Sequence, residues 1–183
     1  MGALRTPRGK WIEAGLQALA AGGADSVRVE SLAKALGVTK GGFYGYFSDR
    51  DDLLEEMLDA WERESVDEVL EKIAHESGDP AEKAKIAGQL TFSENRILPI
   101  DLAVRTWARS DEAVAERLRR VDNRRMQLVR EAIATYCSDP EEVEARSLLA
   151  FCMAIGVHFV AADHPGHTSD QVFARASAII LGR

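Results

Sequence analysis

The side chains best suited to chemistry lie in the eleven residues Gly37–Phe47, with the sequence Gly-Val-Thr-Lys-Gly-Gly-Phe-Tyr-Gly-Tyr-Phe. This segment follows the apolar-patterned residues Leu32–Leu36 and predicts a tight turn that opens a second, very short helix. Two short helices joined by a glycine-containing turn form a helix-turn-helix, the unit that places one helix in the major groove of DNA. The chemistry predicted for this part of the chain is therefore nucleic-acid binding.

The rest of the sequence gives little indication of a metal site or of catalytic residues. Side chains of metal-ligand type gather near the C-terminal end, at His158, Asp163, His164 and His167. Residues 164–167, His-Pro-Gly-His, are typical of a surface loop, and no helical His-x-x-x-His pair accompanies them. No Ser-His-Asp arrangement, phosphate loop or carboxylate pair rises above chance, so we expect no metal, no cofactor and no enzymatic activity.

The elements that must position the DNA-binding residues are predicted to be helices. Leu, Ala, Glu and Arg dominate the sequence, proline is scarce, and alternating runs of β-branched and aromatic residues are nearly absent. We therefore expect an all-α fold. About nine helices are predicted, over approximate residues 8–21, 30–36, 39–47, 48–74, 80–92, 99–108, 111–136, 139–162 and 168–181.

Capping residues mark several predicted helix ends. Gly37 should end the second helix in a left-handed conformation. The predicted N-caps are Thr39, Ser48 in a capping box with Asp51, Asp111, and Asp139 ahead of Pro140. In the first helix, the buried stripe is predicted at Ile12, Leu16, Leu19 and Ala20. Phe43 and Phe47 should anchor the short third helix to the first two helices.

The charge of the chain is unevenly distributed. Residues 1–50 hold seven Lys/Arg and four Asp/Glu, a net charge of +3, whereas residues 51–183 have a net charge of −10. A basic N-terminal part suits contact with DNA phosphates, which supply most of the sequence-independent affinity. The longest apolar run, Leu148–Val157, is about half of the roughly 20 residues that a membrane span needs. We expect a cytoplasmic protein with no membrane partner.

The predicted eighth helix has almost no polar face. A helix that is apolar all round must be buried all round, and a second copy of the chain is the economical way to bury it. Together with the ninth helix it would form a four-helix homodimer interface. The residues predicted at this interface are Leu148, Phe151, Cys152, Ile155, Phe159, Phe173 and Ile180. The alternative is a monomer with a large central helix.

The stretch from Ala24 to Leu58 resembles the DNA-binding domain of tetracycline-repressor-type (TetR) transcriptional regulators. The residues that carry the resemblance are Val29-Glu30-Ser31-Leu32-Ala33, Leu36-Gly37-Val38-Thr39-Lys40-Gly41, Phe43-Tyr44, Tyr46-Phe47 and Arg50-Asp51-Asp52-Leu53-Leu54. The resemblance implies a three-helix DNA-binding domain over residues 1–50. It also implies a long helix leading into a C-terminal helical domain over residues 51–183 that binds a ligand and dimerises.

The resemblance also implies which residues contact double-stranded operator DNA. They are Thr39, Lys40, Gly41, Gly42, Tyr44, Tyr46 and Arg50. Lys40 can reach guanine O6/N7 or a phosphate, and the tyrosine hydroxyls can donate to phosphates. Gly41 and Gly42 lack side chains, so the backbone N–H groups of the first turn can approach the sugar-phosphate closely.

Two positions depart from the family pattern. Gly45 stands where relatives often carry a large or polar groove-facing residue, and Val29 lacks a capping oxygen at the start of the second helix. The short third helix should therefore be weakly formed without DNA. These departures keep an alternative open, a small-molecule-binding or enzymatic helical protein with a degenerate DNA-binding domain.

By the same resemblance, the C-terminal domain binds a small-molecule effector that changes the separation of the two DNA-binding domains. We therefore expect a repressor that its effector releases from a palindromic operator. The sequence does not name the effector. The candidate pocket residues are Trp61, Phe92, Leu102, Trp107, Met126, Tyr136, Phe151 and His158.

Overall fold

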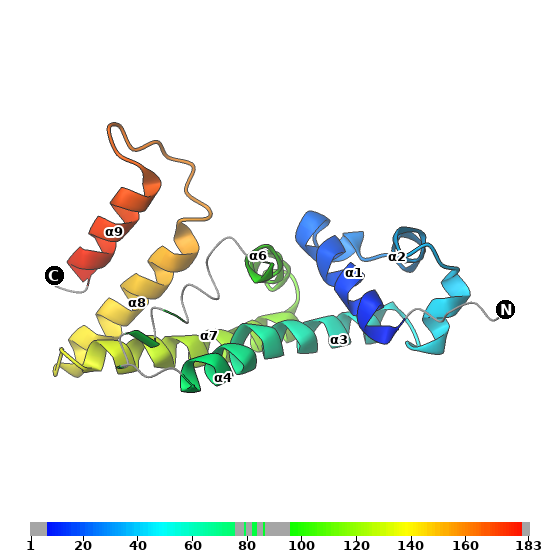
Figure 1. Cartoon of the computed structure of the whole chain (residues 1–183), viewed down its shortest axis with the longest axis horizontal. Coiled ribbons are helices and arrows are strands. Elements are labelled where there is room, and N and C mark those ends of the chain that lie inside the picture. The colour runs from blue at the N-terminus through cyan, green and yellow to red at the C-terminus, as the bar shows by residue number, and fades with distance from the viewer. Residues whose placement is uncertain (1–6, 76–78, 80–81, 84–85, 87–95, 181–183) are drawn as a thin grey trace. The chain divides into compact units, whose positions relative to one another are not determined.

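The computed structural model describes residues 7–75, 79, 82–83, 86 and 96–180 (Figure 1). The described residues form helices and turns and contain no strand, which confirms the all-α prediction. The α-helices are α1 (Arg8–Gly22), α2 (Val29–Ala35), α3 (Arg50–Glu62), α4 (Glu68–Ala74), α6 (Ile97–Trp107), α7 (Glu112–Ala134), α8 (Pro140–Gly156) and α9 (Ser169–Ile180). The helix predicted near residues 80–92 lies largely outside the described residues.

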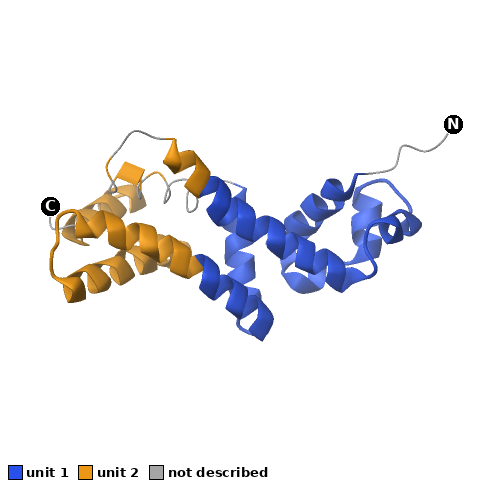
Figure 2. Ribbon diagram, turned by 90° about the horizontal axis from the view of Figure 1, so that it is seen from below, with its two compact units in different colours: residues 1–69, 94–121 blue, residues 70–93, 122–183 orange. Residues whose placement is uncertain are grey.

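Packing divides the chain into two compact units, coloured separately in Figure 2. The first comprises residues 1–69 and 94–121, and the second comprises residues 70–93 and 122–183. The predicted division at residue 50 concerns DNA and effector binding, and it stays a prediction. No helix among the described residues is long and apolar enough to cross a membrane.

The core of the first unit lies where α1 packs against α2, α3 and α6. Leu16 and Leu19 of α1 are buried as predicted, but Trp11 and Gly15 join them in place of the half-buried Ile12 and Ala20. A side chain at position 15 would meet the Sδ atom of Met57 at 2.5 Å, so glycine there allows α1 to approach α3 closely.

The end of α2 is formed as predicted. Gly37 has a φ of 68°, the left-handed conformation that glycine adopts without strain. The N–H of Val38 donates to the carbonyl of Ala33 at 2.9 Å, and the N–H of Gly37 donates to Lys34 at 3.2 Å. This pair of bonds is the Schellman motif, and it turns the chain sharply into the next element.

The start of α3 differs from the prediction by one residue. Asp49, and not Ser48, is the N-cap, because its Oδ1 accepts a hydrogen bond from the N–H of Asp52 at 2.9 Å. The carboxylate of Asp52 in turn accepts from the N–H of Ser48 at 2.9 Å. In place of the capping box expected for Ser48 and Asp51, Asp49 therefore caps the N–H of Asp52, and Asp52 returns a bond to the N–H of Ser48.

The predicted long helix from residue 48 to residue 74 is interrupted by a wide turn. After α3, residues Arg63–Asp67 form a π-helical segment, η3, which leads directly into α4. Ser65 and Val66 of η3 are buried, and the Ser65 hydroxyl has no hydrogen-bond partner among the described residues. Short π-helical segments inside α-helices are rare and occur frequently at functional sites.

Capping residues mark the starts of α7, which begins in the first unit and continues into the second, and of α8, which lies in the second unit. The Asp111 carboxylate caps α7 as predicted, accepting from the N–H groups of Ala113 and Val114. Asp139 caps α8 ahead of Pro140, also as predicted. However, α8 ends at Gly156 and does not reach residue 162, because the N–H groups of His158 and Phe159 bond three residues back in a tight turn.

Candidate nucleic-acid interface

The predicted recognition helix is a 3-10 helix, η2 (Lys40–Gly45). Thr39 occupies its N-cap position, but its hydroxyl makes no capping hydrogen bond, which corrects the predicted cap. A 3-10 helix has tighter turns and poorer hydrogen-bond geometry than an α-helix. Its position therefore depends on the side chains that attach it to the neighbouring elements. We call α1, η1 (Ala24–Ser26), α2, η2 and α3 together the head.

Aromatic packing supplies that attachment. Phe43 is fully buried and meets the ring of Trp11 from α1 edge-on, with the ring centroids 5.4 Å apart. Phe47 is also buried and stacks on Phe43 at 5.1 Å. The Arg8 guanidinium lies over the outer side of Phe47, 5.1 Å from its centroid. The predicted anchoring of η2 to α1 by Phe43 and Phe47 is confirmed.

Most of the predicted DNA-contacting residues lie on the surface of the head. Thr39, Lys40, Gly41 and Tyr44 are exposed, and Gly42, Tyr46 and Arg50 are half-buried. Tyr44 is the largest of the four exposed residues and leaves 55% of its surface exposed beside the buried Phe43. An aromatic side chain with a hydroxyl at its tip can cover apolar surface and still reach a phosphate. The assignment of all seven residues to DNA contacts stays a prediction.

Lys40 is held by a carboxylate in the isolated chain. Its ammonium forms an ion pair with Oε1 of Glu30, which lies in the first turn of α2. The hydrogen bond between them lowers the pKa of Glu30 and raises the pKa of Lys40, and Tyr44 contributes further to the raised pKa of Lys40. Sequence reasoning did not identify Glu30 as part of this surface.

Arg50 is directed into the head. Its Nε donates to the carbonyl of Val27 at 2.7 Å, and Nη2 donates to the carbonyl of Ala24 at 2.6 Å. These bonds fasten the start of α3 to the turn before α2, so in the isolated chain this guanidinium holds the head together. A contact between Arg50 and a phosphate stays a prediction.

The glycines of η2 have space around them. A methyl group at Gly41 would come no closer than 3.8 Å to Thr39 Oγ1, and one at Gly42 would lie 3.9 Å from the ring of Trp11. Neither residue has a positive φ. The isolated head therefore does not require glycine at these two positions, which is consistent with a requirement imposed by close approach of DNA.

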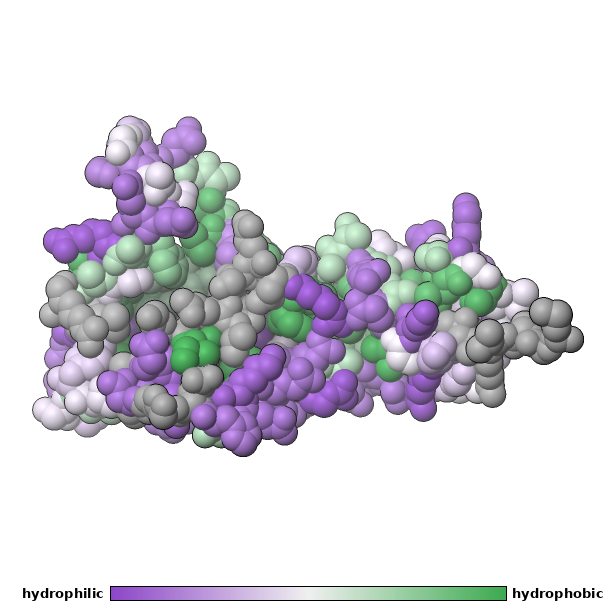
Figure 3. Space-filling model, in the orientation of Figure 1, coloured by the Kyte–Doolittle hydropathy of each residue, from purple (hydrophilic) through white to green (hydrophobic). Residues whose placement is uncertain are grey.

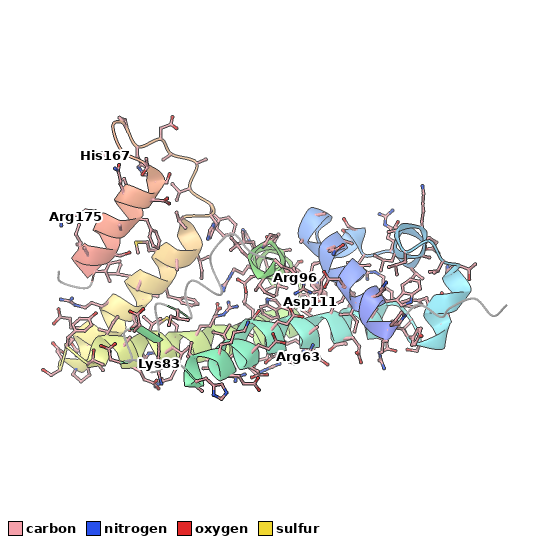
Figure 4. The ribbon with its side chains drawn as sticks, in the orientation of Figure 1. Arg63, Lys83, Arg96, Asp111, His167 and Arg175 are labelled. Atoms are coloured by element: carbon pink, nitrogen blue, oxygen red, sulfur yellow. The ribbon has the colours of Figure 1, made fainter. Side chains whose placement is uncertain are left out.

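Sequence reasoning also missed the ion pairs that connect α6 to the head. Arg96 lies at the start of α6 (Figure 4), and its Nε donates to both carboxylate oxygens of Glu13 at 3.1 Å. Its Nη1 bonds Glu64 of η3. The hydrogen bonds from Arg96 lower the pKa of the Glu13 carboxyl. No local pattern marks this contact, because 83 positions separate Glu13 from Arg96 in the sequence.

A second connection to α6 is buried. Asp101 is fully buried, and its Oδ1 accepts from the indole N–H of Trp61 at 3.2 Å. Its other oxygen accepts from Nε of Arg105 at 2.8 Å. A buried carboxylate that binds an indole and a guanidinium fixes the mutual orientation of α3 and α6.

The predicted pocket residues divide between the two units. Trp61, Leu102 and Trp107 belong to the first unit, where Trp61 is fully buried. Met126, Tyr136, Phe151 and His158 belong to the second, where Met126 and Phe151 are buried and Tyr136 is exposed. Phe92 lies outside the described residues. A shallow hollow at the start of α7 is lined by Asp111, Glu112, Ala113, Ala115, Glu116 and Arg119, none of which is a predicted pocket residue.

The residues predicted at a dimer interface include several exposed apolar side chains. Leu148 and Phe159 leave 55% and 60% of their surface exposed, and Cys152 and Phe173 are exposed too. Ile155 and Ile180 are half-buried, whereas Phe151 is buried within its own unit. Leu149 and Val160, which were not assigned to the interface, are also exposed. Figure 3 shows hydrophobic residues among hydrophilic ones over α8 and α9.

Residues 12–57 match the model of the bacterial regulatory proteins of the tetR family. None of the curated proteins matches the chain. Several solved structures share the fold over almost the whole chain. A putative transcriptional regulator from Saccharomonospora viridis, in complex with choline, has a TM-score of 0.77 and 17% identity, over 94% of each chain.

Two further structures cover the chain as fully. The fatty acid degradation regulator FadR from Bacillus halodurans has a TM-score of 0.68 and 21% identity, over 96% of this chain and 98% of its own. The ketosteroid transcriptional regulator KstR2 of Mycobacterium tuberculosis has a TM-score of 0.64 and 17% identity, over 99% and 96%. At these identities, the structural similarities show a shared fold.

The N-terminal head of this all-α chain presents a short helix after a tight turn, and a lysine and a tyrosine of that helix are exposed. Together with the matched residues, these features define a DNA-binding transcriptional regulator. The head contains residues 12–57, which match the model of the tetR family of bacterial regulatory proteins, and the head is therefore similar to the DNA-binding part of those proteins.

Proposed function

We propose that this chain is a homodimeric transcriptional repressor that binds a palindromic operator and leaves it when a small molecule binds. The observation that carries the DNA-binding part is the exposed surface of η2, where Lys40 and Tyr44 lie beside glycines that the isolated fold does not require. We further propose that the protein acts in the cytoplasm, without a metal or cofactor, and by binding rather than catalysis.

The homodimer is supported by the apolar side chains of α8, of α9 and of the turn that follows α8. Leu148, Leu149 and Phe159 leave more than half of their surface exposed in the single chain. The two helices pack together, and the Arg146 guanidinium donates to the carbonyl of Ile180 at 2.8 Å. Several large apolar side chains exposed on neighbouring helices are typical of an interaction site, and a twofold arrangement would place one head on each half of a palindrome.

The effector is supported by analogy with the structural neighbours. The regulator from Saccharomonospora viridis was crystallised with choline, and two other neighbours are named for fatty acid degradation and for ketosteroids. We propose that this chain likewise binds a small organic molecule, and that the complex favours a spacing of the heads that does not fit DNA. A dimer that contacts successive major grooves needs its recognition helices about 34 Å apart.

Fluorescence anisotropy with the promoter region beside its own gene, repeated across salt concentrations, tests the DNA-binding proposal. The affinity should fall steeply as salt rises, because bound phosphates release counterions. Absence of binding at low salt, or an affinity that does not depend on salt, would contradict the proposal. Candidate metabolites added to the same assay would then identify the effector by the loss of binding.

Two variants test the assigned contacts. Lys40→Ala and Tyr44→Phe each remove one donor from the exposed surface of η2. Each should weaken operator binding by about tenfold, the equivalent of 1.4 kcal/mol, and leave the dimer intact in analytical ultracentrifugation. A variant that loses the dimer would show instead that the substituted residue is structural.

A further inference from the structure

The ion pair between Glu30 and Lys40 places a negative charge on the surface that is proposed to meet DNA. Lys40 begins η2, and Glu30 lies in the first turn of α2, so two different elements contribute to the pair. The side chains remain 48% and 67% exposed respectively, which leaves both of them accessible to DNA. A lysine that served only to attract phosphate would gain nothing from a carboxylate bound to it.

We propose that Glu30 is a specificity-determining residue, which turns Lys40 away from DNA phosphates and toward uncharged acceptors on base edges. The proposal rests on the DNA-binding function proposed above and concerns the same surface.

The physical basis is the difference in charge between the two kinds of acceptor. A phosphate carries a full negative charge, so a phosphate bound by Lys40 is repelled by the Glu30 carboxylate beside it. Guanine O6 and N7 are uncharged acceptors, and they meet no such repulsion. Glu30 therefore lowers the affinity of Lys40 for phosphate more than its affinity for guanine.

The geometry of an ammonium group allows Lys40 to bind Glu30 and a base together. An ammonium group has three N–H donors, and Oε1 of Glu30 accepts from one of them. The remaining two can reach O6 and N7 of one guanine while the ion pair persists. Glu30 is ionised near neutral pH as an exposed glutamate ordinarily is, and the hydrogen bond from Lys40 lowers its pKa further.

Glu30→Gln removes the negative charge and keeps the size of the side chain. Lys40 should then bind phosphates on any sequence, so the variant should bind non-specific DNA more tightly. The expected gain is about two- to fivefold, the usual effect of an exposed ion pair. The salt dependence of non-specific binding should also steepen by about one phosphate contact for each protomer.

The experiment compares two duplexes and two charge variants of the full-length protein. One probe is a random-sequence duplex of about 40 base pairs, and the other is the tightest-binding duplex selected from a randomised pool. Asp25→Asn is the matched control, because it removes the same charge from an exposed carboxylate of the head and leaves the Glu30–Lys40 pair in place. Glu30→Gln should tighten binding to the random duplex two- to fivefold more than Asp25→Asn does, with a smaller change on the selected duplex.

A second comparison traces the effect to Lys40. In a Lys40→Met background, Glu30→Gln should change the affinity for random DNA no more than Asp25→Asn does. Circular dichroism and thermal melting check that each variant folds. If Glu30→Gln melts early, Glu30→Ala in the same comparison removes the carboxylate without burying an amide.

Two results would overturn the proposal and leave the proposed function standing. In the first, Glu30→Gln and Asp25→Asn change the affinity for the random duplex by the same factor. In the second, Glu30→Gln raises the affinity for both duplexes by the same factor. A wild-type chain that binds neither duplex at low salt would instead overturn the DNA-binding function, and this proposal with it.

Discussion

Arg50 and Gly41 belong to the same predicted contact surface, but the structure gives them different roles in the isolated chain. The Arg50 guanidinium binds two backbone carbonyls of the head, so its removal would damage the fold as well as any phosphate contact. Gly41 has no such structural task, because a methyl group there has room. A substitution at Gly41 is therefore the cleaner test of DNA contact.

Gly41→Ala should leave the melting temperature equal or slightly higher and weaken operator binding by about tenfold. Alanine reduces the freedom of the unfolded chain, whereas its methyl group keeps the backbone N–H groups of η2 away from the sugar-phosphate. Thermal melting and fluorescence anisotropy measure the two effects. Gly9→Ala is the control, because a methyl group at position 9 meets no atom within 4 Å, and this variant should bind DNA as the wild type does.

Glu13 should make the stability of the protein depend on pH below neutrality. The hydrogen bonds from Arg96 lower its pKa in the folded chain from the ordinary value of 4.5. The stabilisation is therefore complete above about pH 4.5 and is lost as the pH falls through the lower, folded pKa. Because the pair is partly exposed, it should contribute less than about 1 kcal/mol to the free energy of unfolding.

Urea unfolding of Glu13→Gln at pH 7 and pH 3 measures this contribution. The variant should be less stable than the wild type at pH 7, and the difference should shrink at pH 3. Glu116→Gln breaks an exposed pair with Arg119 within α7 and should cause a smaller change. A destabilisation by Glu13→Gln that is the same at both pH values would contradict the assignment.

At the scale of elements, most helices could be predicted because their ends carry local signals. Gly37, Asp111 and Asp139 act within four residues of their own position, so the sequence alone identifies them. The cap of α3 was misassigned by one residue, since Ser48 and Asp49 are both good N-caps. The aromatic anchors of η2 were also predictable, since apolar residues in a surface helix seek the core.

Contacts between distant parts of the chain could not be predicted. The bonds of Arg50 and the ion pairs of Arg96 connect residues more than 20 positions apart, and no periodicity encodes them. The π-helical turn of η3 was missed because its residues also suit an α-helix. The DNA contacts, the pocket and the dimer interface stay predictions, because each involves a molecule outside the single chain.

Because η2 is a 3-10 helix, a substitution within it should change the stability of the head. Gly45 is its last residue and does not have a positive φ, so alanine fits its backbone. Gly45→Ala should raise the free energy of unfolding by up to about 1 kcal/mol, or the melting temperature by about 2–4 °C, without abolishing DNA binding. An equal or lower melting temperature would count against a weakly formed element.

At the scale of the whole molecule, the exposed apolar surface of α8 and α9 predicts a dimer that a single charge can disrupt. Leu148→Glu should dissociate the dimer at micromolar concentration, because a carboxylate buried at an interface lacks a partner. The fold of the protomer should survive, since Leu148 is 55% exposed in the single chain. Analytical ultracentrifugation and circular dichroism measure the two properties.

Asn123→Glu places the same charge on an exposed position of α7 and is the control for this substitution. It should remain dimeric. If the Leu148→Glu protein stays dimeric, the interface lies elsewhere. If the Leu148→Glu protein unfolds, Leu148 belongs to the core of the protomer. Weak operator binding by the monomeric variant would further support a two-headed arrangement on DNA.

The π-helical segment Arg63–Asp67 also determines which sequence changes this part of the protein can tolerate. Its wide turn holds one residue more than an α-helical turn of the same length, and the buried Val66 and Val69 follow from that register. Deleting one residue within it would restore the ordinary turn and rotate both valines by about 100° relative to α3. Substitutions in this segment should therefore be tolerated far better than deletions, and among relatives its length should vary less than its composition.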